Sequence, residues 1–297
     1  MSLVAAVINP VKVDDVDALK RAIAERAGAE VSWWLTTEDD PGAGQTEQAV
    51  ADGAKLVLVC GGDGTVASCA GALAGTGVAM AVVPDGTGNL LARNVGIPLE
   101  LPAALEVAFA GADRQLDVLE AGDQRFLVMA GLGFDAALIR DTDEQLKARV
   151  GWLAYLGGLG RAIRRHRPAR YEIRVDDQPP MRRRAIGVLV GNVGDLQAGI
   201  TLLPDATPHD GTLDVITLSP MSLLDWPVLV GRILRGRPDG GRQADLLRGT
   251  RVRIRAGHRV PFEFDGDYVG ERTELDVRVL AGALLLRCPA ESPVGAE

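Results

Sequence analysis

The first part of the chain alternates short apolar runs with segments that carry apolar residues at helical spacing. The apolar runs cover residues 3–9, 31–36, 55–60 and 78–83. A helical pattern starts at Asp14 and stops at Gly28, and further helices are expected from about Thr46 to Ala54 and from Thr65 onward. Short continuous apolar strands that alternate with helices indicate a parallel sheet covered on both faces. The pattern therefore predicts an α/β domain over residues 1–120.

After about Asp117 strand-like runs follow one another more closely and helices become rare. These runs cover residues 114–121, 125–131, 171–176, 185–191, 213–218, 251–256, 260–265, 275–280 and 283–288. Two helix candidates interrupt them, at 143–166 and 222–235. The pattern predicts a β-rich, sandwich-like second domain over 121–284, and the segment 285–297 is a candidate to complete the first domain.

Composition narrows the class of protein without changing the predicted fold. The 297 residues are 47% hydrophobic and 24% charged, which is typical of a globular protein with a well-filled core. A net charge of −8 argues against a nucleic-acid partner, because phosphate neutralisation needs a surplus of Lys and Arg. The three cysteines show neither zinc spacing nor a disulfide framework, so a reducing cytoplasm is expected. The N-terminal run lacks the basic region of a signal peptide, and every apolar run is shorter than a membrane span.

Two glycine-rich loops follow adjacent predicted strands. One is Gly61-Gly62-Asp63-Gly64-Thr65, after the third run, and the other is the stretch PDGTGN at 84–89, after the fourth. In an open α/β sheet ligands bind beyond the carboxyl ends of the strands, where glycine lets backbone N–H groups approach a phosphate and a helix N-terminus attracts it. Thr65 is expected to cap its helix and Asp63 to offer an acceptor for a metal or hydroxyl. A plain tight turn explains one such loop but is a weaker explanation for two.

The first loop is neither a P-loop nor a GxGxxG fingerprint. It resembles the GGDGT signature of diacylglycerol kinases, sphingosine and ceramide kinases, NAD kinases and phosphofructokinases. The second loop is similar to the P-x-G-T-x-N-x-x-A loop of the diacylglycerol kinase catalytic family, which includes soluble bacterial lipid kinases. Further pieces of the family pattern follow in order: GLGFDA at 131–136, KARVGWLAYLGGL at 147–159, QAGITLLPDATPHDGTLDV at 197–215 and FEFDGDYVGE at 262–271. The resemblance covers nearly the whole chain and implies an N-terminal domain like those of NAD kinases and diacylglycerol kinases.

The resemblance implies that ATP lies across the cleft between the domains. Asp63 would then be essential for positioning the phosphates and Mg²⁺. The residues that match the family's ATP site are Asn9, Pro10, Thr36, Gly61, Gly62, Asp63, Gly64, Thr65, Val66, Ala67, Ser68, Gly86, Thr87 and Asn89.

The general base is the point at which the chain departs from the family. Members carry Asp-Gly-Glu between two strands, and the Glu takes the proton from the lipid hydroxyl. Here Phe264-Asp265-Gly266-Asp267 places Asp267 at that position, with a side chain one methylene shorter. A displacement of about 1 Å can cost on the order of 100-fold in rate. Asp-Gly is also ordinary hairpin chemistry, and Glu271 is a weaker alternative base.

Two further sites follow from the resemblance. A structural Mg²⁺ would take Asp210 as its carboxylate ligand, with Thr207 and Thr212 contributing through backbone carbonyls, in keeping with the oxygen ligands of hard cations. The competing reading is a capped turn at HDGT. Asp135 would contact the lipid head group, as an acidic residue does in related sphingosine kinases, or would cap a helix that starts at Ala136.

The favoured function is an ATP- and Mg²⁺-dependent kinase of a lipid alcohol, with diacylglycerol as the default acceptor and phosphatidic acid as the product. Residues 150–167 combine Trp152 and Tyr155 with four arginines, which suits either an interfacial helix or a core helix with a basic end. A transient contact with the inner face of the membrane is expected of a cytoplasmic lipid kinase. The sequence does not decide between a monomer and a homodimer. The rivals are an NAD kinase and a non-catalytic nucleotide- or lipid-binding relative.

Overall fold

The computed structural model describes residues 3–133, 168–195, 201–220, 225–233, 235–238 and 242–290. The chain divides into two compact units. Unit 1 comprises residues 1–118, 125–127 and 280–297, and unit 2 comprises 119–124 and 128–279. The predicted roles of the two domains, nucleotide binding and lipid binding, stay predictions.

Unit 1 is built on a parallel sheet. Its elements are β1 (Val4–Ile8), α1 (Val16–Ala27), β2 (Val31–Leu35), α2 (Ala43–Ala51), β3 (Leu56–Gly61), α3 (Asp63–Leu73), β4 (Ala79–Pro84), α4 (Leu90–Asn94), α5 (Leu101–Ala110) and the first part of β5 (Ala112–Ala121). The strands lie in the order β4-β3-β1-β2, and all of these pairs are parallel. At Leu285 and Leu286 the end of β14 (Asp267–Cys288) adds a parallel pairing with β4.

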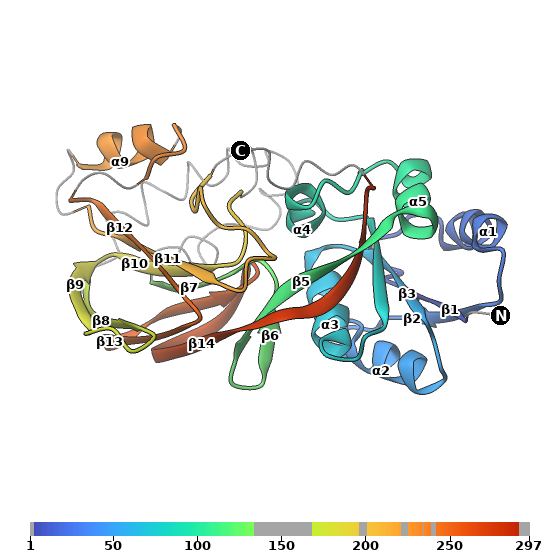
Figure 1. The fold of residues 1–297 in the computed structure, drawn as a ribbon, viewed down its shortest axis with the longest axis horizontal. Helices are drawn as coiled ribbons and strands as arrows, with labels where there is room; N and C mark the ends of the chain where they lie inside the picture. Colours follow the sequence, from blue (N-terminus) through green and yellow to red (C-terminus); the bar gives the residue numbers. More distant parts are fainter. Residues whose placement is uncertain are drawn as a thin grey trace. The chain divides into compact units, whose positions relative to one another are not determined.

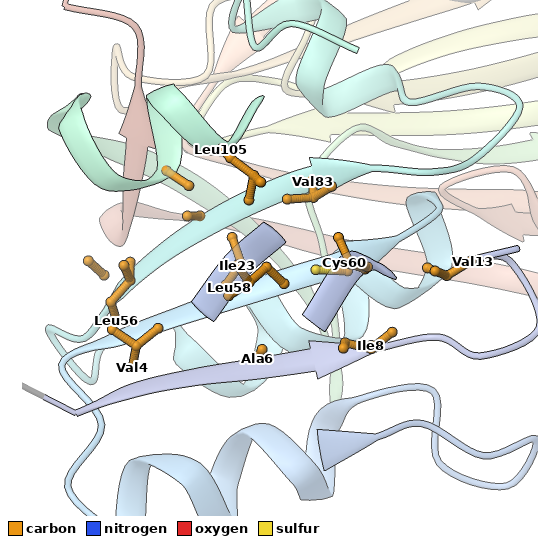
Figure 2. Packing of buried hydrophobic residues seen from close by; sticks show 14 residues of the cluster. Val4, Ala6, Ile8, Val13, Ile23, Leu56, Leu58, Cys60, Val83 and Leu105 are labelled. Carbon is orange, nitrogen blue, oxygen red and sulfur yellow. The ribbon is translucent and has the colours of Figure 1, made fainter. Parts of the chain in front are cut away.

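The helices of unit 1 cover both faces of this sheet. Figure 1 shows α1 and α5 on one side and α2 and α3 on the other. Every residue of β1, β3 and β4 is buried, which matches their uninterrupted apolar sequences. On the α1 side the core joins alternate strand residues to Ile23 of α1 and Leu105 of α5. In Figure 2 Ile23 lies beside Leu58 of β3.

All three cysteines are buried free thiols in unit 1. Cys60 and Cys69 are 0% exposed and Cys288 is 1% exposed. Burial is the largest cause that raises the pKa of each thiol, to about 12 for Cys69 and about 11 for Cys288. They serve as small core residues and remain protonated at neutral pH.

Unit 2 is a set of antiparallel strands. Its elements are β7 (Met129–Gly133), β8 (Ala169–Val175), β9 (Met181–Ala185), β10 (Gly187–Gly191), β11 (Leu213–Leu218), α9 (Asp225–Ile233), β12 (Ala244–Gly249), β13 (Arg251–Phe264) and most of β14, while the short β6 (Gln124–Phe126) pairs with β5. The order is β12-β11-β10-β7-β13-β14. β13 pairs with β8 near its start and with β7 near its end, so one long strand joins the β8–β9 ladder to the strands β12-β11-β10-β7.

Several predicted elements differ from the observed ones. The runs 251–256 and 260–265 are one strand, β13, with a register shift between Arg255 and Val260. Likewise 275–280 and 283–288 both belong to β14. Strands β9 and β12 and helices α4 and α5 were not predicted. In β9 three consecutive arginines hide the alternation that marks a half-buried strand.

The helix α2 starts three residues before the predicted Thr46, at Ala43, with Gly42 as its N-cap. α9 lies within the predicted range 222–235. The helix predicted at 143–166 lies outside the described residues. Among the residues that the structure does describe, no helix is long and apolar enough to cross a membrane.

Candidate active site

The predicted ATP-site residues of unit 1 gather at one edge of its sheet. In β1, β2 and β3 the residues Ile8, Leu35 and Cys60 are paired neighbours, and Gly61 pairs with Pro84 of β4. All four strands therefore end at the same carboxyl edge. The next residues along the chain are Asn9, Thr36, the GGDGT loop and the PDGTGN loop. The structure thus brings the predicted set together, although what binds to it stays a prediction.

The GGDGT loop leads directly into α3. The helix begins at Asp63 with Gly62 as its N-cap, and a glycine has no side chain to cap the first turn. The N–H groups of a first helical turn lack intrahelical acceptors, and they attract anions through the helix dipole. The loop therefore ends in a helix N-terminus of the kind that binds phosphate.

The predicted capping role of Thr65 is wrong. Thr65 lies inside the first turn of α3 and is 4% exposed. Its hydroxyl oxygen accepts a hydrogen bond of 3.0 Å from the side-chain amide of Asn9. The prediction failed because the helix starts two residues earlier than its apolar pattern suggests. Thr65 instead links the loop after β1 to the loop after β3.

Asp63 links the two glycine-rich loops. Its Oδ1 accepts a hydrogen bond of 2.6 Å from the backbone N–H of Leu90, the first residue of α4. Leu90 immediately follows PDGTGN, so one carboxylate joins the start of α3 to the end of the second loop. The sequence marked Asp63 as a site residue but gave no sign of this partner, which lies 27 positions away.

Asn89 closes the PDGTGN loop on itself. Its side-chain oxygen accepts from the N–H of Gly86 at 2.9 Å, and its amide donates to the carbonyl of Gly86 at 2.8 Å. Its φ of 48° is left-handed, a conformation that Asn adopts more readily than most residues. Asn89 is 7% exposed, so its structural contribution is to hold the shape of the loop.

The two loops approach each other through glycine backbones. A Cβ on Gly86 would lie 2.7 Å from the Cα of Gly62 and 2.9 Å from the Asn89 side-chain oxygen. Only glycine fits there without displacing backbone atoms.

Replacing Gly86 by Ala is therefore expected to push the loops apart and lower kcat/KM for ATP by roughly 10- to 100-fold. Steady-state kinetics with varied ATP would measure this loss. Gly71→Ala, within α3, is the matched control, since its Cβ would lie 3.4 Å from the Cβ of Arg125, an ordinary van der Waals contact. Equal kinetics for the Gly86→Ala variant and the wild type would contradict this role of the loop contact.

The remaining predicted ATP-site residues differ in accessibility. Thr36 and Val66 are buried, at 5% each, Ala67 and Ser68 are half-buried, and Pro10, Gly64 and Thr87 are exposed. Asp85 of the second loop is a further candidate site residue, and it was not among the predicted ones. Burial is the largest effect that raises the pKa of Asp85, the Asp14 carboxylate raises it further, and Lys12 lowers it. Lys12 and Asp14, just after β1, therefore lie near the same edge.

Unit 2 holds the predicted base at a hairpin. Phe264 and Asp267 are paired, and the two residues between them, Asp265 and Gly266, have φ of 47° and 89°. Positive φ at both central residues is the geometry that makes Asp-Gly a preferred two-residue hairpin turn. Asp267 is the exposed first residue of β14. The turn reading of Asp-Gly and the predicted role of Asp267 are thus compatible, because they fall on different residues.

Asp265 has a structural role that the sequence analysis missed. Its Oδ1 accepts hydrogen bonds of 2.9 Å from the N–H groups of both Val128 and Met129. Its own N–H donates to the carbonyl of Met129 at 2.8 Å. Glu263, which is 0% exposed, accepts from the N–H of Gly266 at 2.8 Å. The two carboxylates hold the hairpin that presents Asp267.

Replacing Asp265 by Ala is expected to lower the free energy of unfolding by about 2–4 kcal/mol, because two buried N–H groups lose a charged acceptor. Asp265→Asn keeps one oxygen and tolerates positive φ, so its cost should be smaller, about 1 kcal/mol. Urea denaturation would measure both, with Asp177→Ala in the exposed β8–β9 turn as the control. A midpoint unchanged by Asp265→Ala would contradict this role.

The predicted metal residues lie together in unit 2. Asp210 Oδ1 accepts from the N–H of Thr212 at 2.9 Å and from its hydroxyl at 2.7 Å. Burial tends to raise the pKa of Asp210, but hydrogen bonds from Thr212 and Thr207 and the charge of Arg248 outweigh it, and the pKa is lowered. In the part of the chain that the structure covers, no group of three His, Cys, Asp or Glu side chains could hold a metal ion.

Asp135 and the basic segment 150–167 lie outside the described residues.

Comparisons with known proteins agree with this architecture of a parallel α/β unit with two glycine-rich loops and a β-sandwich unit. The diacylglycerol kinase catalytic domain matches residues 9–121. The YegS C-terminal NAD kinase beta sandwich-like domain matches residues 128–288. A Pseudomonas aeruginosa protein named "Probable lipid kinase YegS-like" is 35% identical over 280 residues, which is 92% of this chain and 89% of that protein. The chain belongs to the YegS-like family of lipid kinases, which carry the diacylglycerol kinase catalytic domain.

Solved structures show the same fold. A diacylglycerol kinase from Bacillus anthracis superposes with a TM-score of 0.78 at 22% identity, over 97% of this chain and 96% of that one. An NAD kinase from Archaeoglobus fulgidus, solved in complex with ATP, superposes with a TM-score of 0.54 at 15% identity, over 96% of this chain and 93% of that one. At these identities the likeness concerns the fold alone.

Proposed function

We propose that this lipid kinase transfers the γ-phosphoryl group of ATP to the hydroxyl of diacylglycerol and produces phosphatidic acid. The observation that carries the proposal is the N-terminus of α3, which has a glycine as its N-cap and lies with two glycine-rich loops at the carboxyl edge of the sheet. Phosphoryl transfer depends mostly on positioning and charge neutralisation. First-turn N–H groups together with glycine backbones supply both for the phosphates of ATP.

In this proposal Asp63 acts by fixing the loops. Because its carboxylate accepts from the N–H of Leu90 at 2.6 Å, it holds the PDGTGN loop against the start of α3. The Asn9–Thr65 hydrogen bond fixes the loop after β1 to the same helix. A site built from three loops bonded to one another keeps its donors in place when phosphate binds, and this preorganisation favours catalysis.

The proposed role of Asp267 is to accept the proton of the lipid hydroxyl. It is exposed at the hairpin, and the end of β13 that leads into this hairpin is buried and paired with β7. A carboxylate is a competent general base when the accepting oxygen lies within hydrogen-bond reach of the hydroxyl. Hydrogen bonds of Asp265 and Glu263 hold the hairpin in one conformation. A hairpin held in this way can place the short Asp267 side chain at a fixed position for proton transfer.

Mg²⁺ is the proposed metal of the reaction and of the loop around Asp210. The donors there are a carboxylate and two threonines, all oxygen, which fits a hard cation. Asp210 would hold the ion together with backbone carbonyls of Thr207 and Thr212 and with water. The ion would neutralise the negative charge of the Asp210 carboxylate. Arg248, which pairs with Asp214 at 3.0 Å, already supplies part of the positive charge near Asp210.

An NAD kinase is the second candidate, since one such enzyme shares the fold at a TM-score of 0.54. The match of residues 9–121 to the diacylglycerol kinase catalytic domain favours the lipid acceptor. A non-catalytic relative is the third candidate, raised by Asp267 in place of Glu. The proposed setting is the cytoplasm, with transient contact at the inner face of the membrane where the lipid is found.

An acceptor panel tests the proposal. Purified protein with radiolabelled ATP and Mg²⁺ would be offered diacylglycerol, a sphingosine-like base, another lipid alcohol and NAD. We expect label in phosphatidic acid. Transfer to another lipid alone would replace diacylglycerol as the acceptor, transfer to NAD alone would support the second candidate, and ATP binding without transfer to any acceptor would support the third.

A further inference from the structure

The β8–β9 ladder of unit 2 carries two like charges directly opposite each other. Arg170 of β8 and Arg184 of β9 are paired residues, and both are exposed. Neither side chain forms a hydrogen bond or an ion pair within the part of the chain that the structure describes. Like charges at directly opposite positions destabilise a sheet. The pair therefore needs an explanation other than the stability of the strand pairing.

Several arginines of β9 and of the adjoining strand β13 are paired with acids. Arg182 contacts Glu172 at 2.9 Å across the same ladder. On β13, Arg251 and Arg253 contact Asp276 at 2.7 and 3.1 Å, and Arg255 contacts Glu274 at 3.2 Å. In a chain with a net charge of −8, two facing arginines whose side chains form no ion pair with a described residue mark a local excess of positive charge.

The two arginines line a hollow on the surface of unit 2. A cavity of about 390 Å³ is lined by Pro168, Ala169, Arg170, Arg184, Gly257 and His258. Gly257 and His258 lie in the register shift of β13, where the ladder with β14 is interrupted between Arg255 and Val260. A bulge of this kind redirects side chains at the end of a paired segment. It adds an imidazole to the two guanidinium groups.

We propose that this hollow, the Arg170–Arg184 site, binds a phosphate group. Guanidinium groups present planar sets of N–H donors that match phosphate oxygens, and two of them facing one hollow suit a dianion. His258, which lines the same hollow, adds a ring nitrogen that can donate to a further phosphate oxygen. The phosphate belongs to a lipid headgroup or to a soluble phosphate compound, because both present the same oxygens.

The proposal is independent of the kinase reaction. It uses only residues of β8, β9 and β13, none of which has been assigned to the ATP site, the base or the metal. Failure of the acceptor panel would leave it intact, and its own failure would leave the proposed reaction intact.

The test compares two double variants of the full chain. Arg170→Gln with Arg184→Gln removes the proposed site. Arg182→Gln with Arg255→Gln removes the same total charge from ion-paired arginines of the same strands. The first probe is inorganic phosphate, followed through the His258 ring signal in NMR spectra. The chain has only three histidines, so this signal can be assigned with a His258→Gln variant.

The second probe is a vesicle of phosphatidylcholine with or without phosphatidic acid, followed by flotation. We expect the site variant to bind at least one probe about 30-fold more weakly than the wild type, since each arginine near an anionic surface adds about five-fold. The control variant should bind close to the wild type, because its two arginines are already neutralised by Glu172 and Glu274. Loss with vesicles alone identifies a lipid headgroup, and loss with inorganic phosphate alone identifies a soluble ligand. Equal binding by the two double variants to both probes, or no binding by the wild type, would overturn the proposal.

Discussion

Replacing Asp63 by Ala is expected to lower kcat for phosphoryl transfer by at least about 100-fold. The substitution removes the 2.6 Å hydrogen bond to the N–H of Leu90 and releases the PDGTGN loop from the start of α3. The phosphates would then bind to loops that no longer hold one geometry. Initial-rate kinetics at saturating ATP would measure the loss.

Two variants control the Asp63 experiment. Asp63→Asn keeps an oxygen for the Leu90 N–H, so it should preserve the fold of the loops while it removes the charge. Asp52→Ala, at the exposed end of α2, removes a carboxylate of unit 1 away from the loops and should retain wild-type rates. Full activity of Asp63→Ala would show that the loops do not depend on this carboxylate.

Replacing Asp267 by Asn is expected to lower kcat by roughly 100- to 10,000-fold, the range that general base catalysis contributes. The amide has nearly the same shape but cannot accept the proton. Because Asp267 is exposed, the free energy of unfolding should stay unchanged. Rate measurements with diacylglycerol, together with urea denaturation, would separate chemistry from folding.

The length of the side chain at position 267 gives a second measurement. Asp267→Glu supplies the longer carboxylate that the family pattern carries, and we expect it to retain activity within about 10-fold of the wild type, since a carboxylate is preserved. Glu271→Gln, four residues along β14, is the matched control and should be neutral. Loss of activity in Glu271→Gln with an active Asp267→Asn would assign the base to Glu271.

Much of unit 1 could be predicted from the sequence because its strands are buried on both faces. Each of β1, β3 and β4 is an uninterrupted apolar run, and each is fully buried. Unit 2 was harder to predict because one of its strands faces solvent. In β9 the residues Arg182, Arg183 and Arg184 are all exposed, so no apolar periodicity marks the strand. Long strands were also divided at irregular positions, such as the shift in β13.

The candidate site was predictable where its residues form a contiguous motif, and less so where it depends on distant partners. GGDGT and PDGTGN are visible as glycine clusters that follow strands. Asp63 accepts a hydrogen bond from the backbone N–H of Leu90, and Asp265 accepts one from the backbone N–H of Val128. Almost any residue type supplies a backbone N–H. No sequence pattern can identify such a donor. The start of α3 was placed too late because the glycines of its first turn are typical of a loop.

The measurement that tests the account most directly is the partition of label between organic and aqueous phases after incubation with radiolabelled ATP, Mg²⁺ and diacylglycerol vesicles. Wild-type protein is expected to move label into an organic-phase product that comigrates with phosphatidic acid, and Asp63→Ala is not. Label that stays entirely in the aqueous phase with a folded, ATP-binding wild-type protein would contradict this expectation.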